Sequence, residues 1–355
     1  MPVSTRDLNE QRSPGAALAR PSLIDRWLRF VQRQRAPYWF TYLILFILES
    51  ALIHALSWLD GWLPRFTFEP LLLLFPLWLW GPLTILTWLN QTATSVVPDF
   101  GRLLELDEEG VESLREEFTT MPTRGVLLSG AFWVAIYVLL SALTYESFYA
   151  GFGLGRLAAV TVFTAGLISY SIGSILYYHS LRQLWLVDRT VKRVRRFNLF
   201  ALDPAYAFAR LTSRTGIGWM VMAAGTLLIF PLEIARGTVL TFLVLQALLA
   251  LAAFVLPLRA VNAQLSMEKQ GRLADVNRRI QSTVERLHGV LDSGETAEAP
   301  PLGGILGALR SERDVLMSIS TLPWRAGTLT GFVSATVFSI ISVFIQMGVR
   351  NLLGG

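Results

Sequence analysis

Long runs of apolar residues recur along the chain, separated by polar segments that are rich in arginine. Seven of these runs approach the roughly 20 residues that a helix needs to cross a hydrocarbon core of about 30 Å. They lie at residues 38–59, 68–89, 126–144, 157–178, 217–234, 239–258 and 328–349. The pattern predicts an all-α, polytopic membrane protein with seven transmembrane helices.

The fifth and sixth runs almost join in one apolar stretch, at residues 217–258. One helix of that length would measure about 63 Å at 1.5 Å per residue, far more than the thickness of a bilayer core. Pro231, Glu233, Arg236 and Gly237 lie together in the middle of the stretch. We therefore expect two spans that are joined by a tight hairpin.

The basic residues predict the orientation, because short cytoplasmic loops retain Lys and Arg. The segments on one side of the seven spans carry 27 of the 31 basic residues. The other side carries only Arg65, Arg156, Arg236 and Arg350. This separation places the N-terminus in the cytoplasm and the C-terminus outside.

Composition agrees with a membrane protein. Hydrophobic residues make up 53% of the chain, charged residues only 16%, and the mean hydropathy is +0.47; soluble domains carry roughly 25% charged residues. These values exclude a disordered protein and an ordinary cytosolic enzyme, and the absence of cysteine excludes disulfides and thiolate metal sites. The first 37 residues show no signal-peptide pattern. We expect an integral protein of the plasma (inner) membrane, surrounded by the lipid bilayer.

The pI of 9.7 comes from loops that face anionic lipid, so no nucleic-acid partner is expected. Four regions follow from the pattern: a cytoplasmic N-terminal segment at 1–37, a six-helix bundle with two cytoplasmic loops at 38–258, cytoplasmic amphipathic helices and a linker at 259–327, and the seventh span with an external C-terminus at 328–355. The acidic part of the first cytoplasmic loop, 105–117, predicts a short helix that ends before Met121. Its acidic face is expected either to be solvated or to pack against basic residues of the second loop.

The cytoplasmic segment after the sixth span predicts an amphipathic helix with an apolar seam. Its apolar residues recur at spacings of three and four, as in a coiled coil, and polar residues lie between them. The seam consists of Leu273, Val276, Ile280, Val284 and Leu287. We expect this helix to continue the sixth span, and a second short helix near 305–319 to follow a linker at 292–301. The seam either packs within one chain or anchors an oligomer.

Signals for catalysis are sparse. His54, His179 and His288 lie in separate segments, and none belongs to a metal-binding motif. The sequence contains no P-loop and no nucleophile elbow. We therefore expect neither an enzyme nor a metal site nor a cofactor.

One candidate ligand site lies near the outer half of the first span. A carboxylate inside a membrane is costly and often functional, and Glu49 lies within this span. The expected site is an outward-facing ligand pocket formed by Glu49, His54, Trp58, Tyr145 and Tyr149. The alternative is a neutral Glu49 that forms a hydrogen bond with a neighbouring helix.

A second candidate lies on the last span, where small and polar residues share one face at 100° per residue. The expected pore-lining residues are Thr328, Gly331, Ser339, Ser342 and Gln346. Such a stripe either lines a water-filled pathway or packs closely against another helix.

The layout resembles the insect-type odorant and gustatory receptor superfamily. Ser339-Ile340, five further residues and then Gln346-Met347 fall in the register of the signature of its gustatory branch, with identity at Gln346 alone. The segment 316–346 is also similar to uncharacterised prokaryotic membrane proteins. The superfamily resemblance implies a seven-span, ligand-gated cation channel, a homotetramer held by cytoplasmic helices, with the last span around the pore.

The leading hypothesis is therefore a homo-oligomeric channel or chemoreceptor-like protein that has cations and a small-molecule ligand as partners. The alternatives are a transporter that uses a site near Glu49, a membrane signalling scaffold, and a structural membrane subunit.

Overall fold

The computed structural model describes residues 21–143, 156–229, 236–294, 297 and 299–353. These residues form an all-α fold, in which the one extended pairing is an isolated bridge between Pro21 and Pro122. The helices are α2 (Leu23–Arg33), α3 (Tyr38–Leu59), the 3-10 helix η1 (Pro70–Leu73), α4 (Leu74–Leu104), α5 (Glu108–Thr119), α6 (Thr123–Leu143), α7 (Arg156–Arg193), α8 (Asp203–Ile229), α9 (Arg236–Val255), α10 (Leu258–Ser293), α11 (Ala299–Ser318) and α12 (Ala326–Leu353).

Five helical segments in the described ranges are long and apolar enough to cross a membrane. They are Tyr38–Leu59, Pro70–Leu104, Thr123–Leu143, Arg156–Arg193 and Val244–Ser293. These segments contain the predicted spans one to four and most of span six. The apolar part of α12, Gly327–Ser342, is shorter, and the predicted fifth span reaches beyond the end of α8 at Ile229 into residues outside the described ranges. The length and composition of these five helices indicate an integral membrane protein.

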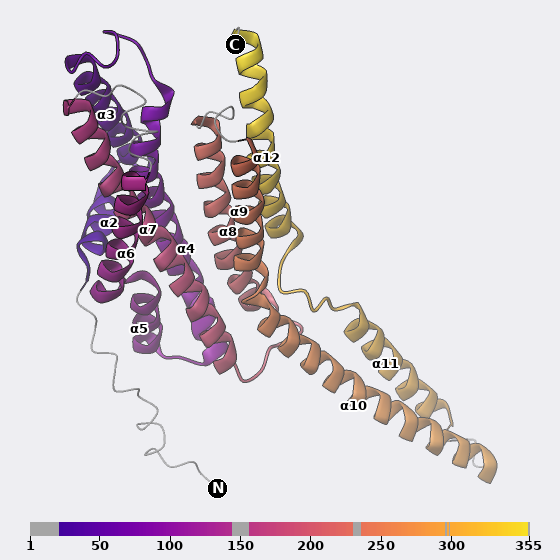
Figure 1. Cartoon of the computed structure of the whole chain (residues 1–355). Helices are drawn as coiled ribbons and strands as arrows, with labels where there is room; N and C mark the ends of the chain where they lie inside the picture. Colours follow the sequence, from indigo (N-terminus) through magenta and orange to yellow (C-terminus); the bar gives the residue numbers. More distant parts are fainter. Residues whose placement is uncertain (1–20, 144–155, 230–235, 295–296, 298, 354–355) are drawn as a thin grey trace.

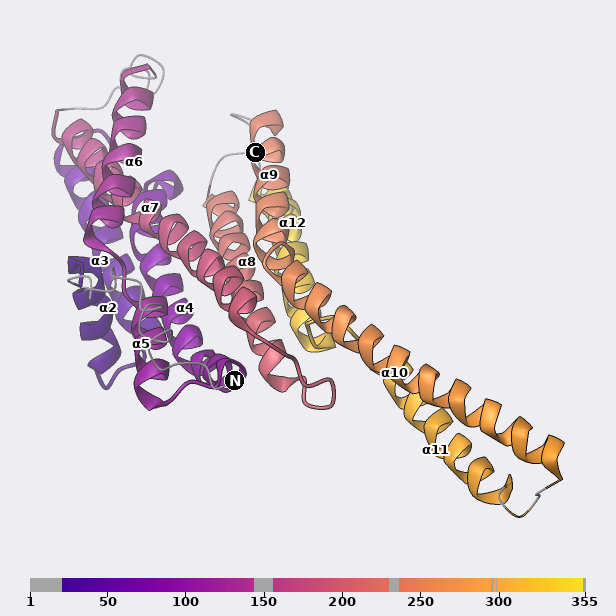
Figure 2. The ribbon, with the colours of Figure 1, turned by 90° about the horizontal axis from the view of Figure 1, so that it is seen from below.

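The helices form two groups, and a hairpin projects from one of them. Figures 1 and 2 show α2 to α7 gathered in one group and α8, α9 and α12 in the other. Helices α10 and α11 run side by side away from both groups. Helix α4 packs against α3, α5 and α7 and also against α8, so it connects the two groups.

The contact between α4 and α8 depends on glycine. A Cβ atom at Gly218 of α8 would lie 2.6 Å from Cγ2 of Ile85, and one at Gly81 of α4 would lie 2.7 Å from the sulfur of Met222. Small residues allow membrane helices to approach closely and gain van der Waals contact. Ile85 is buried and Met222 is also covered, so any larger side chain at these glycines would displace packed neighbours.

Polar contacts reinforce this contact at the predicted cytoplasmic end. Nη1 of Arg214 donates to Oγ1 of Thr92 at 2.7 Å, and the Arg214 guanidinium lies 5.4 Å from the centre of the Trp88 ring. Arg210 forms an ion pair with Asp99 at 2.6 Å. Helices α4 and α8 are thus held by apolar packing in one part and by side-chain hydrogen bonds in another.

The sixth span continues into the projecting hairpin, as the sequence predicts. Pro257 precedes α10 and marks the junction with α9. Helix α10 ends at Gly294, whose φ of 75° is a left-handed conformation that glycine adopts without strain. Helix α11 begins at Ala299, earlier than the predicted start near residue 305, because Pro300 and Pro301 occupy its first turn, where backbone N–H groups have no helical partner.

The N-terminal segment contains a helix that the hydrophobic pattern did not predict. Ser22 and Asp25 form a capping box at the start of α2, while Leu28 and Val31 are buried against the bundle. The Asp25 carboxylate also accepts the backbone N–H of Met121, at 3.2 Å. Burial raises the pKa of this carboxyl group above its usual value, while its hydrogen bonds from Ser22 and Met121 act in the opposite direction.

The glycine contact between α4 and α8 can be tested with a double-mutant cycle. We expect Gly218→Ala to lower the free energy of unfolding by about 1–3 kcal/mol, because the added methyl group collides with Ile85. Ile85→Ala alone should cost about 2–5 kcal/mol by leaving a cavity. The double variant should cost clearly less than the sum, because the methyl group then enters the vacated space. Reversible unfolding in mixed detergent micelles measures all three values, and strict additivity would contradict the contact.

Candidate functional sites

The intramembrane carboxylate Glu49 has a hydrogen-bond partner on the neighbouring helix. The indole Nε1–H of Trp80 on α4 donates to Oε2 of Glu49 on α3 at 2.6 Å, and the Glu49 side chain is half-buried. A polar group in a membrane requires such a partner. The contact agrees with the alternative in which Glu49 joins two helices.

His54 and Trp58 bind the loop that follows their own helix. Nε2 of His54 accepts the backbone N–H of Glu69 at 3.2 Å, so its other nitrogen, Nδ1, carries the proton that is donated to the carbonyl of Ser50, at 2.8 Å. The imidazole stacks on Phe68 with ring centres 5.1 Å apart. Nε1 of Trp58 donates to the Thr67 carbonyl at 2.9 Å. Both side chains therefore stabilise the loop.

The expected ligand pocket is brought together only in part. His54 and Trp58 are neighbours, with ring centres 6.1 Å apart, whereas the hydrogen bond of Glu49 is to Trp80 on another helix. Tyr145 and Tyr149 lie outside the described residues. The pocket stays a prediction.

A buried polar network, which the hydrophobic pattern did not predict, connects α4, α5 and α7. Nε2 of His179 lies 2.8 Å from Oδ1 of Asn90, and Nε2 of Gln183 donates to the carbonyl of Phe118 at 3.0 Å. Asn90 Nδ2 donates to the carbonyl of Thr119 at 3.3 Å. These amides satisfy carbonyls at the C-terminus of α5 that have no partner within the helix. Nδ1 of His179 and Oε1 of Gln183 are buried without a partner.

The acidic helix α5 lies where the sequence predicts, on basic residues of the second loop region. Arg189 of α7 forms an ion pair with Glu117 at 3.3 Å, and Arg182 donates to the Glu117 carbonyl at 2.6 Å. The expectation of a docked acidic helix is thus confirmed.

The small-residue stripe of α12 packs on α8 within the same chain. Ser339 and Ser342 are fully buried. Oγ of Ser339 donates to the Met220 carbonyl of α8 at 3.0 Å, and Oγ of Ser342 donates to the Phe338 carbonyl of its own helix at 2.8 Å. Of the two uses expected for the stripe, helix packing describes these two positions in the single chain.

The rest of the stripe has mixed surroundings. Gly331 is exposed and Thr328 is half-buried, while the side chain of Gln346 lies outside the described part. Phe332 is buried and stacks on Phe254 of α9. Its ring also lies close to Gly216 of α8, where an added Cβ atom would be only 2.7 Å from the ring. The side of α12 away from α8 is apolar and exposed in the single chain, and it includes Val337, Ile341 and Phe344.

The predicted anchor seam packs first against its own hairpin. Val276 is buried, Leu273 and Ile280 pack against the same cluster, and Leu316 of α11 is 1% exposed. Val284 and Leu287 are half-buried. Lys269 joins the two helices by donating to the carbonyls of Met317 and Ile319 at 2.8 and 2.7 Å. The seam therefore holds α10 to α11, and its role between chains stays a prediction.

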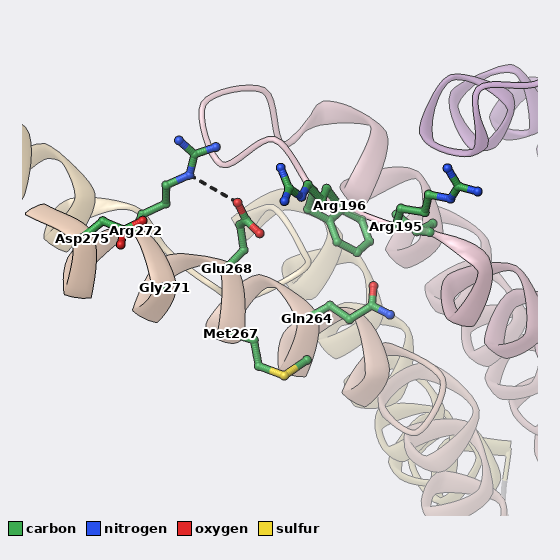
Figure 3. A pocket seen from close by; sticks show the side chains of 10 residues that line it. Arg195, Arg196, Gln264, Met267, Glu268, Gly271, Arg272 and Asp275 are labelled. Carbon is green, nitrogen blue, oxygen red and sulfur yellow. Dashed lines mark hydrogen bonds and ion pairs between the residues drawn. The ribbon is translucent and has the colours of Figure 1, made fainter. Parts of the chain in front are cut away.

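A polar hollow of about 580 Å³ lies where the α7–α8 loop meets α10 (Figure 3). The loop contributes Val194, Arg195, Arg196 and Phe197, and α10 contributes residues from Gln264 to Asp275. Figure 3 shows Arg196 and Arg272 on either side of Glu268, which forms an ion pair with Arg272 at 3.3 Å. The sequence shows a cluster of basic residues at 192–196 on one wall of this hollow, but it gives no sign that α10 forms the other wall.

In the described ranges, no three His, Cys, Asp or Glu side chains gather closely enough to hold a metal ion. The chain matches no protein-family model, no curated protein sequence and no solved structure.

Single cysteines on α12 distinguish packing from a wet pathway, since the chain has no native cysteine. We expect Ser339→Cys and Ser342→Cys to resist small, charged thiol reagents, because α8 covers both positions. Gly327→Cys, exposed at the predicted cytoplasmic end of α12 with nothing within 4 Å of its Cβ position, should react faster by at least about tenfold, in keeping with a barrier difference of about 1.4 kcal/mol. Rates are measured by mass spectrometry on intact protein in membranes. Fast reaction at 339 and 342 would instead support a wet stripe.

Proposed function

We propose that the chain is a homo-oligomeric membrane protein with seven spans, which acts as a channel or chemoreceptor-like protein. The hairpin of α10 and α11 holds the subunits together, and α12 lies at the centre of the assembly. The observation that carries the proposal is the hairpin, which projects from the two helix groups (Figure 2). It keeps exposed apolar side chains besides the seam that packs α10 on α11.

The exposed face of α11 supports an interface with a second copy. Ile305 and Val315 are about half exposed, at 49% and 50%, and Ala308 lies on the same face at helical spacing. An exposed apolar surface on a projecting element favours protein contact.

The hairpin is connected to α12, so that a movement of the hairpin can be transmitted to the helix proposed to lie at the centre of the assembly. Helix α11 leads through residues 319–325 into α12. Trp324 lies against Phe254 of α9, with ring centres 5.6 Å apart, and Arg325 forms an ion pair with Asp203 of α8. Movement of the hairpin would therefore reach the helix that carries the stripe. Cations are the proposed permeant ions and a small molecule the proposed ligand, by the resemblance of the layout.

A non-channel transporter or membrane scaffold is the second candidate, and a specific observation favours it. Ser339 and Ser342 are covered by α8, so the polar stripe in a single chain leads to no water-filled path. In that function the Glu49–Trp80 contact would mark the intramembrane site. The oligomeric hairpin would then transmit a signal instead of gating a pore.

If the hairpin holds the subunits together, charges on its exposed apolar face should lower the mass of the particles in detergent. Ile305→Asp/Val315→Asp places two charges on the exposed apolar face, which costs several kcal/mol if a partner covers it. We expect smaller particles in detergent, measured by light scattering, with unchanged helical circular dichroism. The control Ser282→Asp/Ser311→Asp adds the same charge at exposed polar positions of the hairpin and should leave the mass unchanged. A wild type that is already monomeric would contradict the proposal.

The seven-span topology predicts the side on which added cysteines react. Arg65→Cys, between α3 and η1, and Gly355→Cys should be labelled by an impermeant reagent from outside the cell. Ser293→Cys, at the end of α10, should be labelled only after the membrane is permeabilised. Labelling of positions 293 and 355 from the same side would contradict the proposed crossing of α12.

A further inference from the structure

Two hollows of opposite character lie along the same pair of structural elements. The first is mainly apolar, measures about 330 Å³, and lies between α7, α8 and α9; its lining includes Leu181, Trp185, Trp219 and Leu256. Its one acidic residue, Asp188, forms an ion pair with Lys192. The second is the polar hollow between the α7–α8 loop and α10. Along each element, the residues of the apolar hollow precede those of the polar hollow.

Helical spacing places both hollows on one face of the continuous α9–α10 segment. Pro257 lines the apolar hollow, and Gln264 and Gly271, at intervals of seven residues, line the polar one. Residues seven apart lie almost above one another on a helix. A single elongated ligand on this face would contact both hollows.

The boundary between the hollows has the chemistry of a membrane surface. Trp185 is 58% exposed, and the guanidinium of Arg189 lies 5.6 Å from the centre of its ring. Trp and Arg side chains are common at the level of lipid headgroups, because their apolar parts face acyl chains and their polar parts face water. The apolar hollow thus lies toward the membrane and the polar hollow toward the cytoplasm.

The polar hollow can accept an anion. Among the ion pairs of the described residues, none involves Arg195 or Arg196. The acidic residues of its lining already have basic partners: Glu268 pairs with Arg272 and Asp275 with Arg278. Exposed pairs of this kind contribute little to stability, so a phosphate group can replace Glu268 as the partner of Arg272. Nothing approaches within 4 Å of a Cβ atom at Gly271, which leaves room at the wall.

We infer that this face binds an anionic phospholipid between the two helix groups. Its phosphate group lies between Arg196 and Arg272, Arg195 adds positive charge to the same wall of the hollow, and an acyl chain lies along Leu181, Trp185 and Leu256. A soluble phosphorylated compound offers the same headgroup chemistry, but the adjoining apolar hollow favours the lipid. A bound lipid of this kind would join α7 to the helix that becomes the hairpin.

Native mass spectrometry of the detergent-purified chain tests the inference. The probes are phosphatidylglycerol, phosphatidylcholine with the same acyl chains, and glycerophosphoglycerol, which is the anionic headgroup without acyl chains. We expect phosphatidylglycerol to bind at least about tenfold more tightly than either of the others. The quaternary ammonium of phosphatidylcholine brings a positive charge beside the arginines, and glycerophosphoglycerol has no acyl chain to bury in the apolar hollow. Equal binding of the two intact lipids would overturn the anion site. Equal binding of the deacylated headgroup would overturn the lipid.

Matched variants locate the binding. Arg195→Gln/Arg196→Gln/Arg272→Gln should weaken phosphatidylglycerol binding at least about tenfold, whereas Arg286→Gln/Arg310→Gln/Arg313→Gln, on exposed parts of the hairpin, should not. Gly271→Leu fills the wall without changing charge and should also weaken binding, while Gly289→Leu, equally open on the same helix, should not. Circular dichroism confirms folding of each variant. Equal loss in the test and control variants would overturn the assignment.

Discussion

The close approach of α4 and α8 is the constraint on which the rest of the structure depends. Helix α4 packs against α3, α5 and α7 of the first group, and α8 packs against α9 and α12 of the second. Their contact needs glycine at 218 against Ile85, and it continues through Arg214 and Thr92 toward the predicted cytoplasmic side. Lipid tails solvate apolar side chains as well as protein does, so this association rests on tight packing and hydrogen bonds, not on the hydrophobic effect. A change in this contact would move the two groups relative to each other.

The α8 group carries the elements with the clearest capacity for assembly. Helix α9 continues into α10, and α11 returns to α12, which packs on α8 through Ser339 and Phe332. The hairpin is therefore attached at both ends to helices that touch each other. If a second copy held the hairpin in place, force on α11 would act on the α12–α8 contact directly. Because that contact covers the polar stripe, assembly and any opening of the stripe would be linked by the same packed surface.

Much of the fold follows from apolar length, and the errors have physical causes. Helix α3 matches its predicted bounds, because both its ends coincide with loss of hydropathy. Helices α4 and α7 continue well past their apolar parts, since α5 packs on their ends and buries residues such as His179 and Gln183. Helix α2 was missed because it has only 11 residues, about half the length of a membrane span, and its apolar residues are interrupted by Asp25, Arg26 and Arg29; the Ser22–Asp25 capping box was its available signal. The stripe on α12 was visible, but its partner was not: a sequence cannot specify which helix covers Ser339.

The proposed lipid contact connects these observations in one mechanism. The lipid would lie between α7 of the first group and α9–α10 of the second. Its acyl chain would fill the apolar hollow that these helices line. Its headgroup would contact Arg272, close to the Lys269 bonds that fix α11 on α10. A ligand that binds one arrangement of the two groups more tightly stabilises that arrangement by its difference in affinity. The lipid composition of the membrane would thus bias the angle at which the hairpin projects. That angle would in turn set the position of the exposed face of α11, where a second copy is proposed to bind.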